Sequence, residues 1–149
     1  MKLEGIGSRV VKSCLMKLDL SSLKKAIESL TKAISRSLKE PEDEEVRDAV
    51  IQRFEYTYEL CWKMLKRQLE REVPNPAEVD QWSFRDLLRT AAERGILTQI
   101  EAWFEYRRQR NLTTHVYDEK KSKSVYQTAT RFLPDAQALL RALQNRSDG

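Results

Sequence analysis

Residues 44–72 read EEVRDAVIQRFEYTYELCWKMLKRQLERE, and apolar side chains recur in this stretch at every third or fourth position. Residues at that spacing lie on one face of an α-helix, so the stretch predicts one long helix with a core-facing side. The predicted core stripe comprises Val46, Val50, Phe54, Tyr58, Cys61, Leu65 and Leu69. The acidic residues 42–45 suit the helix N-terminus, and Val73-Pro74-Asn75-Pro76 should end the helix because proline cannot extend its hydrogen-bond ladder.

The rest of the chain predicts four more helices, since only four glycines and four prolines interrupt it. Their expected ranges are 21–38, 84–94, 98–117 and 122–143. Ser83 with Asp86, and Thr98 with Glu101, have the spacing of capping boxes, and Pro134 should kink or restart the last helix. No segment alternates long enough to predict a strand. The expected fold is therefore all-α, an antiparallel up-and-down bundle of about five helices.

The length of 149 residues favours one domain and excludes a two-domain enzyme. The chain lacks the run of about 18 apolar residues that a membrane helix requires, and its first residues do not resemble a secretory signal, so we expect a cytoplasmic protein. Cys14 and Cys61 could form at most one disulfide and do not have metal-site spacing. We expect both to be reduced, with Cys61 in the core.

The helix predicted over residues 98–117 is apolar on two faces, because Trp103 and Phe104 point well away from Ala102 and Val116 on a helical wheel. Such a helix needs two packing partners. One is the bundle core, and for the other we expect a second copy of the chain in a homodimer. The alternative is that Trp103 covers the end of its own bundle.

Residues 103–131 contain seven basic and three acidic residues, an excess of four that equals the net charge of the whole chain, +4. The basic residues are Arg107, Arg108, Arg110, Lys120, Lys121, Lys123 and Arg131. Aromatic residues lie among them, a combination typical of a nucleic-acid or nucleotide contact. A solvated basic face without a ligand is the alternative.

The single histidine, His115, lies in the run RQRNLTTHVY at residues 108–117. On a continuous helix it would share one wall with Arg110, Asn111 and Tyr117. One histidine without nearby cysteine or carboxylate ligands does not make a zinc site, so we expect no metal and no cofactor. Histidine and arginine can instead supply metal-free acid-base chemistry on RNA, with a second histidine from a dimer partner. A purely structural histidine is the alternative.

The motif Arg110-x4-His115-x-Tyr117, with Asn111 beside the arginine, resembles that of the HEPN superfamily, specifically its HepT-like nucleotidyltransferase substrate-binding proteins. Residues 53–63, RFEYTYELCWK, are similar to the second-helix signature of that family, and residues 85–117 resemble its third and fourth helices. The likeness covers roughly residues 18–143. We expect residues 17–145 to form the bundle and residues 1–16 to be an N-terminal extension, either disordered or reflecting an upstream start codon.

The resemblance implies a homodimer whose catalytic Arg110, Asn111 and His115 face across a composite cleft, while Arg107, Arg108, Lys120, Lys121 and Lys123 hold RNA or a nucleotide. It also implies a partner, a separately encoded minimal nucleotidyltransferase; the present chain is not itself the transferase. In toxin–antitoxin members of the family the bundle is a ribonuclease, and the partner silences it by attaching nucleotidyl groups to the motif tyrosine, here Tyr117. Other members are named as substrate-binding subunits.

Two other functions fit the same residues. A helix-turn-helix DNA-binding module could be formed by helix 84–94, Gly95 and the following basic helix, although Trp103 and Phe104 would then occupy a recognition helix that needs polar groups. A non-catalytic docking subunit could use Arg110 and His115 to hold Tyr117 or a nucleotide phosphate for the transferase.

Overall fold

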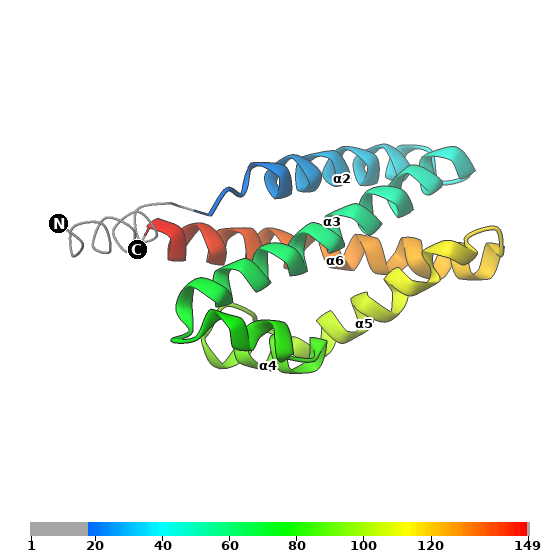
Figure 1. Cartoon of the computed structure of the whole chain (residues 1–149). Coiled ribbons are helices and arrows are strands. Elements are labelled where there is room, and N and C mark those ends of the chain that lie inside the picture. Colours follow the sequence, from blue (N-terminus) through cyan, green and yellow to red (C-terminus); the bar gives the residue numbers. More distant parts are fainter. Residues whose placement is uncertain (1–17, 149) are drawn as a thin grey trace.

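The structure, a computed structural model, describes residues 18–148, and the helical bundle predicted from the sequence is confirmed (Figure 1). Three long helices run side by side, and α5 with the short α4 covers the face of α3 that α2 leaves free. The elements in chain order are α2 (Ser21–Lys39), α3 (Glu44–Glu72), η1 (Pro76–Gln81), α4 (Phe84–Glu93), α5 (Ile100–Asn111), η2 (Leu112–His115) and α6 (Glu119–Asp148). The predicted extension at residues 1–16, with Cys14, lies outside the described residues. None of the described helices is long and apolar enough to cross a membrane.

The central helix α3 has the bounds that its sequence predicts. Asp43 caps it by accepting hydrogen bonds from the backbone N–H groups of Glu45 and Val46, which satisfies donors that have no partner within the helix. The Val73-Pro74 step ends it. The short 3-10 helix η1, which was not predicted, follows because the Asn75 side chain accepts from Ala77 N–H and Pro76 occupies the first helical turn.

The predicted capping box of α4 is confirmed, since Ser83 and Asp86 each bond the other's backbone N–H. The capping box predicted at Thr98 is wrong. α5 begins at Ile100 after Gln99, whose φ of 58° is left-handed, and it has no side-chain cap. The reason is tertiary: Ile96 and Leu97 are both 4% exposed and bond the carbonyl of Ala91, so core packing directs the chain before the helix can start.

The last helix, α6, is longer than predicted at both ends and continues through Pro134 without restarting. Pro134 is exposed, so its ring lies on the solvent side of the bundle. Phe132 and Ala136 on either side of it are fully buried. Their burial holds the two halves of α6 against α3 even though proline removes one hydrogen bond from the ladder.

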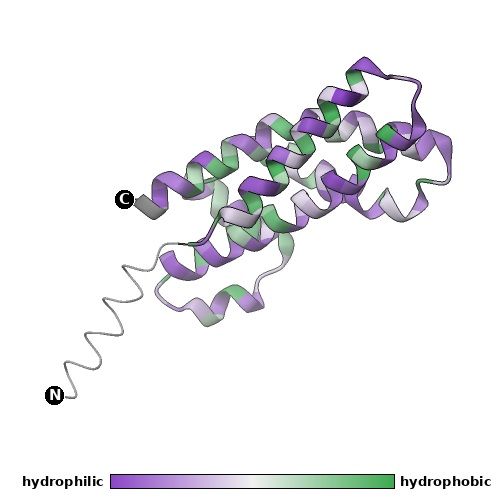
Figure 2. Cartoon of the chain, turned by 90° about the horizontal axis from the view of Figure 1, so that it is seen from above, coloured by the Kyte–Doolittle hydropathy of each residue, from purple (hydrophilic) through white to green (hydrophobic). Residues whose placement is uncertain are grey.

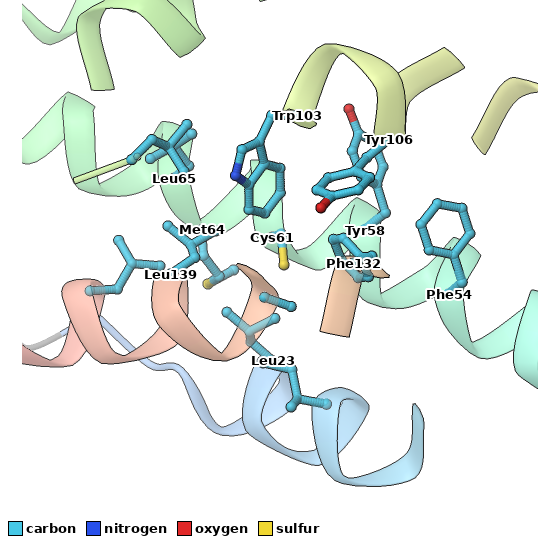
Figure 3. Close-up of a cluster of buried hydrophobic side chains, with 14 of the residues drawn as sticks. Leu23, Phe54, Tyr58, Cys61, Met64, Leu65, Trp103, Tyr106, Phe132 and Leu139 are labelled. Carbon is cyan, nitrogen blue, oxygen red and sulfur yellow. The ribbon is translucent and has the colours of Figure 1, made fainter. Parts of the chain in front are cut away.

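An aromatic cluster fills the centre of the bundle (Figure 3). Phe132 of α6 meets Phe54, Trp103 and Tyr106 in edge-on contacts with ring centroids 5.1 to 5.7 Å apart. Such edge-to-face pairs are favourable beyond the area that they bury. Cys61 is fully buried beside them, as predicted, and its burial raises the pKa of the thiol. Hydrophobic and hydrophilic residues are interspersed along the long helices, as expected where one side of a helix is buried (Figure 2).

Trp103 is a core residue of its own chain, with 2% of its surface exposed. The expectation that a second copy covers it is therefore wrong for this side chain. α5 is apolar on more than one face because it packs against three helices of its own chain, α3, α4 and α6. Phe104 is only partly buried, and the guanidinium of Arg85 lies 4.6 Å from the centre of its ring. The homodimer itself stays a prediction.

An ion-pair cluster ties the ends of α3, α4 and α6 together. Both oxygens of Glu72 accept from Arg146, at 2.7 and 3.0 Å, and Arg94 approaches to 3.5 Å. Burial alone would raise the pKa of Glu72, but hydrogen bonds from Arg146 and Gln68 outweigh it and the pKa lies below the usual 4.5.

Replacing Glu72 with glutamine is expected to lower the free energy of unfolding at neutral pH by about 1–3 kcal/mol, the cost of losing charge-assisted hydrogen bonds. The folded-state pKa of Glu72 is depressed, so its contribution is present above pH 4.5 and is lost as the pH falls through the folded value. Urea unfolding should therefore show a difference in the free energy of unfolding between wild type and Glu72→Gln at neutral pH, and this difference should become smaller in acid. A difference of constant size would contradict the role of the charge. Glu70→Gln, two residues earlier on α3, is the matched control.

Candidate nucleotide and RNA site

The predicted site residues lie where α5 passes through η2 into α6. The prediction of one helix to residue 116 or 117 is wrong, because α5 ends at Asn111 and a 3-10 helix follows. Thr113 causes part of this change: its hydroxyl donates to the carbonyl of Arg110 at 2.8 Å, a local bond that competes with the α-helical ladder. A 3-10 helix has three residues per turn, so the single wall expected from an α-helical wheel does not form.

Arg110 is oriented by two carboxylates of α3. Its Nε lies 2.6 Å from Glu59 Oε1, and its Nη2 lies 3.5 Å from Glu55 Oε1. The second oxygen of Glu59 accepts from the indole N–H of Trp62 at 3.0 Å. Because the side chains of Arg110 and Glu59 are only about 30% exposed, this pair is shielded from solvent more than an ordinary surface pair. The fold therefore holds the guanidinium in a set direction.

Glu55 and Glu59 are site residues that sequence reasoning missed. Both fall on the side of residues 44–72 opposite the core stripe, which predicts a solvent face. Instead α5 packs along that side and brings Arg110 to both of them, although Glu59 lies 51 residues earlier in the chain and Glu55 lies earlier still. The available signal was their place inside the second-helix signature, residues 53–63.

A pocket of about 350 Å³ lies beside Arg110, between α3, η1, α4 and α5. Three of the predicted residues line it: Arg107, Arg110 and Asn111. The guanidinium of Arg107 lies 4.2 Å from the centre of the Phe84 ring, a cation–π contact that holds it at the pocket wall. This pocket has the volume of a small-ligand site. It therefore brings two predicted cations to one concave surface.

His115 and Tyr117 lie outside the lining of that pocket and contact each other. His115 Nδ1 is 3.3 Å from the Tyr117 hydroxyl, and the rings meet edge-on with centroids 5.9 Å apart. The Tyr117 side chain is 83% exposed. The Tyr117 hydroxyl is thus open to a ligand or to another protein, and the half-buried imidazole of His115 lies beside it.

The remaining predicted cations surround this end of the bundle. Lys120, Lys121 and Lys123 occupy the first turns of α6, and all three are exposed. Asp118 caps this end of α6 by accepting from the backbone N–H groups of Lys120 and Lys121. Positive side chains are unfavourable near a helix N-terminus, so they are not there to stabilise α6. This placement gives a positive field suited to an anion.

Two of the cations form exposed ion pairs: Arg108 with Glu105 at 2.6 Å, and Lys123 with Glu119 at 3.4 Å. Burial alone would raise the pKa of Glu105, but hydrogen bonds from Arg108 and Gln109 lower it. Pairs at such exposed positions contribute little and exchange easily, so both cations can turn to a phosphate. The site as a whole can bind a nucleotide or RNA backbone and offers an imidazole for proton transfer.

The chain is similar in sequence to a described protein family and to one curated protein. Residues 18–145 match the family model described as nucleotidyltransferase substrate binding protein like. A curated protein of Haemophilus influenzae named probable ribonuclease HepT is 39% identical over 97 residues, which is 65% of this chain and 66%, or just under two thirds, of that protein.

Two solved structures are similar in fold. One is a Haemophilus influenzae protein described as the fold of a substrate binding domain of a nucleotidyltransferase, with a TM-score of 0.80, 31% identity, and coverage of 85% of this chain and 99% of that chain. The other is a protein of Thermus thermophilus, with a TM-score of 0.62, 28% identity and the same coverage.

Proposed function

The chain belongs to the family of nucleotidyltransferase substrate binding protein-like proteins, which confirms the resemblance drawn from its motifs. From that membership we propose that it is the partner of a separately encoded minimal nucleotidyltransferase and acts in the cytoplasm as a metal-independent ribonuclease, the toxin of a toxin–antitoxin pair. The observation that carries the proposal is the exposed contact between His115 and Tyr117. Arg110, five residues before His115, is held in place by Glu59 of α3. The name of the Haemophilus influenzae relative, probable ribonuclease HepT, supports it.

Cleavage needs one base and one acid. One imidazole removes the proton of a 2′-hydroxyl, whose oxygen attacks the adjacent phosphorus. The bond from phosphorus to the 5′-oxygen breaks, and a second, protonated imidazole gives that oxygen its proton. The products are a 2′,3′-cyclic phosphate and a 5′-hydroxyl. Since each chain has one histidine, we infer that two copies in a homodimer supply the pair.

Arg110 stabilises the charge that develops on the phosphorus oxygens. Its hydrogen bond to Glu59 and its ion pair with Glu55 leave about three of the five guanidinium N–H groups for a phosphate. Holding the arginine in advance removes the cost of ordering it during the reaction. Asn111, the next residue, orients one imidazole. The five surrounding cations named above, Arg107, Arg108, Lys120, Lys121 and Lys123, hold the RNA backbone.

Tyr117 is the residue through which the transferase silences the ribonuclease. Its exposed hydroxyl is accessible to a second protein and lies beside the imidazole. Attaching a nucleotidyl group would place negative phosphate and bulk at that point and repel the RNA backbone.

This proposal predicts that purified protein cuts a labelled RNA in EDTA and leaves 2′,3′-cyclic phosphate ends. Incubation with the cognate transferase and a nucleoside triphosphate should abolish cutting by wild type but not by Tyr117→Phe. Tyr56→Phe, which alters a tyrosine on α3 that is also exposed, should be silenced like wild type. Equal silencing of Tyr117→Phe would contradict the assignment of the modified residue.

The second candidate function is a non-catalytic substrate-binding subunit of the same two-component nucleotidyltransferase. The observation that favours it is the pocket beside Arg110, which could hold a nucleotide without cleaving it. An intact, unmodified dimer that binds nucleotides but cuts no RNA would support this function instead.

A further inference from the structure

The pocket beside Arg110 contains a polar group that the fold leaves unused. Tyr58 of α3 is 2% exposed and lines the pocket, yet its hydroxyl has no hydrogen-bond partner within the described chain. The other fully packed tyrosine of the cluster, Tyr106, donates to Asp135. An unpaired buried hydroxyl costs free energy, and native folds rarely keep one without a reason. A ligand that bonds to Tyr58 would recover this cost.

The position of Tyr58 is set by its neighbours. Its ring lies 6.3 to 6.5 Å from the rings of Phe84, Trp103 and Phe132, so the hydroxyl cannot swing to a new partner without disturbing the core. Burial raises the pKa of this hydroxyl, which keeps it protonated and able to donate at all physiological pH values. The pocket lining thus includes one buried donor whose position is set by the core.

The pocket is lined by aromatic side chains and by three cations, two of which are paired with carboxylates of the same lining: Arg110 with Glu59 and Lys66 with Asp80. Trp62 and Trp82 are partly buried aromatic side chains on its lining, and the bond from Trp62 to Glu59 sets the plane of one of them. Arg107 and Arg110 lie at the same lining. Aromatic faces combined with guanidinium groups are the surroundings that bind an unpaired base and its phosphate, because every base has a flat face and each nucleotide carries negative charge.

We propose that this pocket receives one unpaired nucleobase of a ribonucleotide. The base lies against the tryptophan faces, its polar edge bonds to Tyr58, and its phosphate reaches Arg107 and Arg110. The inference rests on the proposed function and adds a base-specificity site to it. Only a base with an acceptor opposite the Tyr58 hydroxyl can supply its missing hydrogen bond. Each chain carries the whole pocket.

The test measures binding to the full chain by tryptophan fluorescence and calorimetry. The probes are the four nucleoside 5′-monophosphates, inorganic phosphate, a single-stranded RNA and the same RNA as a duplex, and RNA is titrated into His115→Ala so that none is cut. Tyr58→Phe is expected to weaken binding about 2- to 10-fold and to reduce the preference among bases. Trp82→Ala is expected to weaken it about 5- to 100-fold. Tyr56→Phe, on the same helix outside the pocket, should bind like wild type.

Each outcome decides the proposal. If the binding of mononucleotides is weakened by Tyr58→Phe and Trp82→Ala, the ligand is a free nucleotide. If only the binding of single-stranded RNA is weakened by these substitutions, the ligand is a base within a strand. The proposal is overturned if inorganic phosphate or duplex RNA binds as well as the nucleotides and the single strand do. It is also overturned if neither Tyr58→Phe nor Trp82→Ala changes the binding. Tyr58→Phe keeps the test decisive if Trp82→Ala does not fold. If wild type cuts RNA but binding does not depend on the pocket residues, only the pocket proposal fails. If binding depends on the pocket residues but no RNA is cut, only the proposed ribonuclease activity fails.

Discussion

Replacing His115 with alanine is expected to lower RNA cleavage in EDTA by about two to four orders of magnitude, the usual share of general acid-base catalysis. The effect is this large because the chain has one histidine, so the substitution removes both base and acid from a two-fold site. The side chain bonds only to Tyr117 among the described residues, so thermal unfolding should not change. Thr114→Ala, an exposed neighbour in η2, should cut RNA like wild type. Undiminished cleavage by His115→Ala would exclude histidine chemistry.

The same variant tests whether the site is shared between two chains. Mixing wild type with an excess of His115→Ala, and allowing the subunits to exchange, should reduce the activity per wild-type chain, because most wild-type chains would pair with a partner that lacks the second imidazole. Activity that stays constant per wild-type chain would show that one histidine suffices and would contradict the composite cleft.

Replacing Trp103 with alanine is expected to lower the free energy of unfolding by about 3–5 kcal/mol, as for other large aromatic side chains in a core. Trp103 contacts Tyr58, Tyr106 and Phe132 and is almost fully buried, so the substitution leaves a cavity that the aromatic cluster cannot easily fill. Urea unfolding followed by circular dichroism measures the loss.

Phe104→Ala, the next residue on α5, is the matched control and should cost less because its ring is only partly buried. The two variants also separate core from interface. A core residue lowers stability by the same amount at every protein concentration, whereas the cost of losing an interface residue shrinks as dilution dissociates the wild-type dimer. A concentration-dependent loss for Trp103→Ala would contradict its place in the core of one chain.

The helices were predictable where local chemistry decides them. The stripe of α3, the acidic cap at its start, the prolines at its end and the Ser83–Asp86 box all act within a few residues, and all appear in the structure as expected. The start of α5 was not predictable, because burial of Ile96 and Leu97 overrides the local signal at Thr98. Its end depends on a competing side-chain bond from Thr113.

The sequence by itself determined the helical bundle, the family and the positions of Arg110, His115 and Tyr117, since periodicity, caps and short motifs are written in neighbouring residues. Only the tertiary structure decided what those residues face. Three examples are the pairing of Arg110 with Glu59, the burial of Trp103 within its own chain and the burial of the unpaired Tyr58 hydroxyl. Each of them depends on segments that lie far apart in the sequence. Such contacts depend on which helix faces pack together, and packing is set by the whole core rather than by any local pattern.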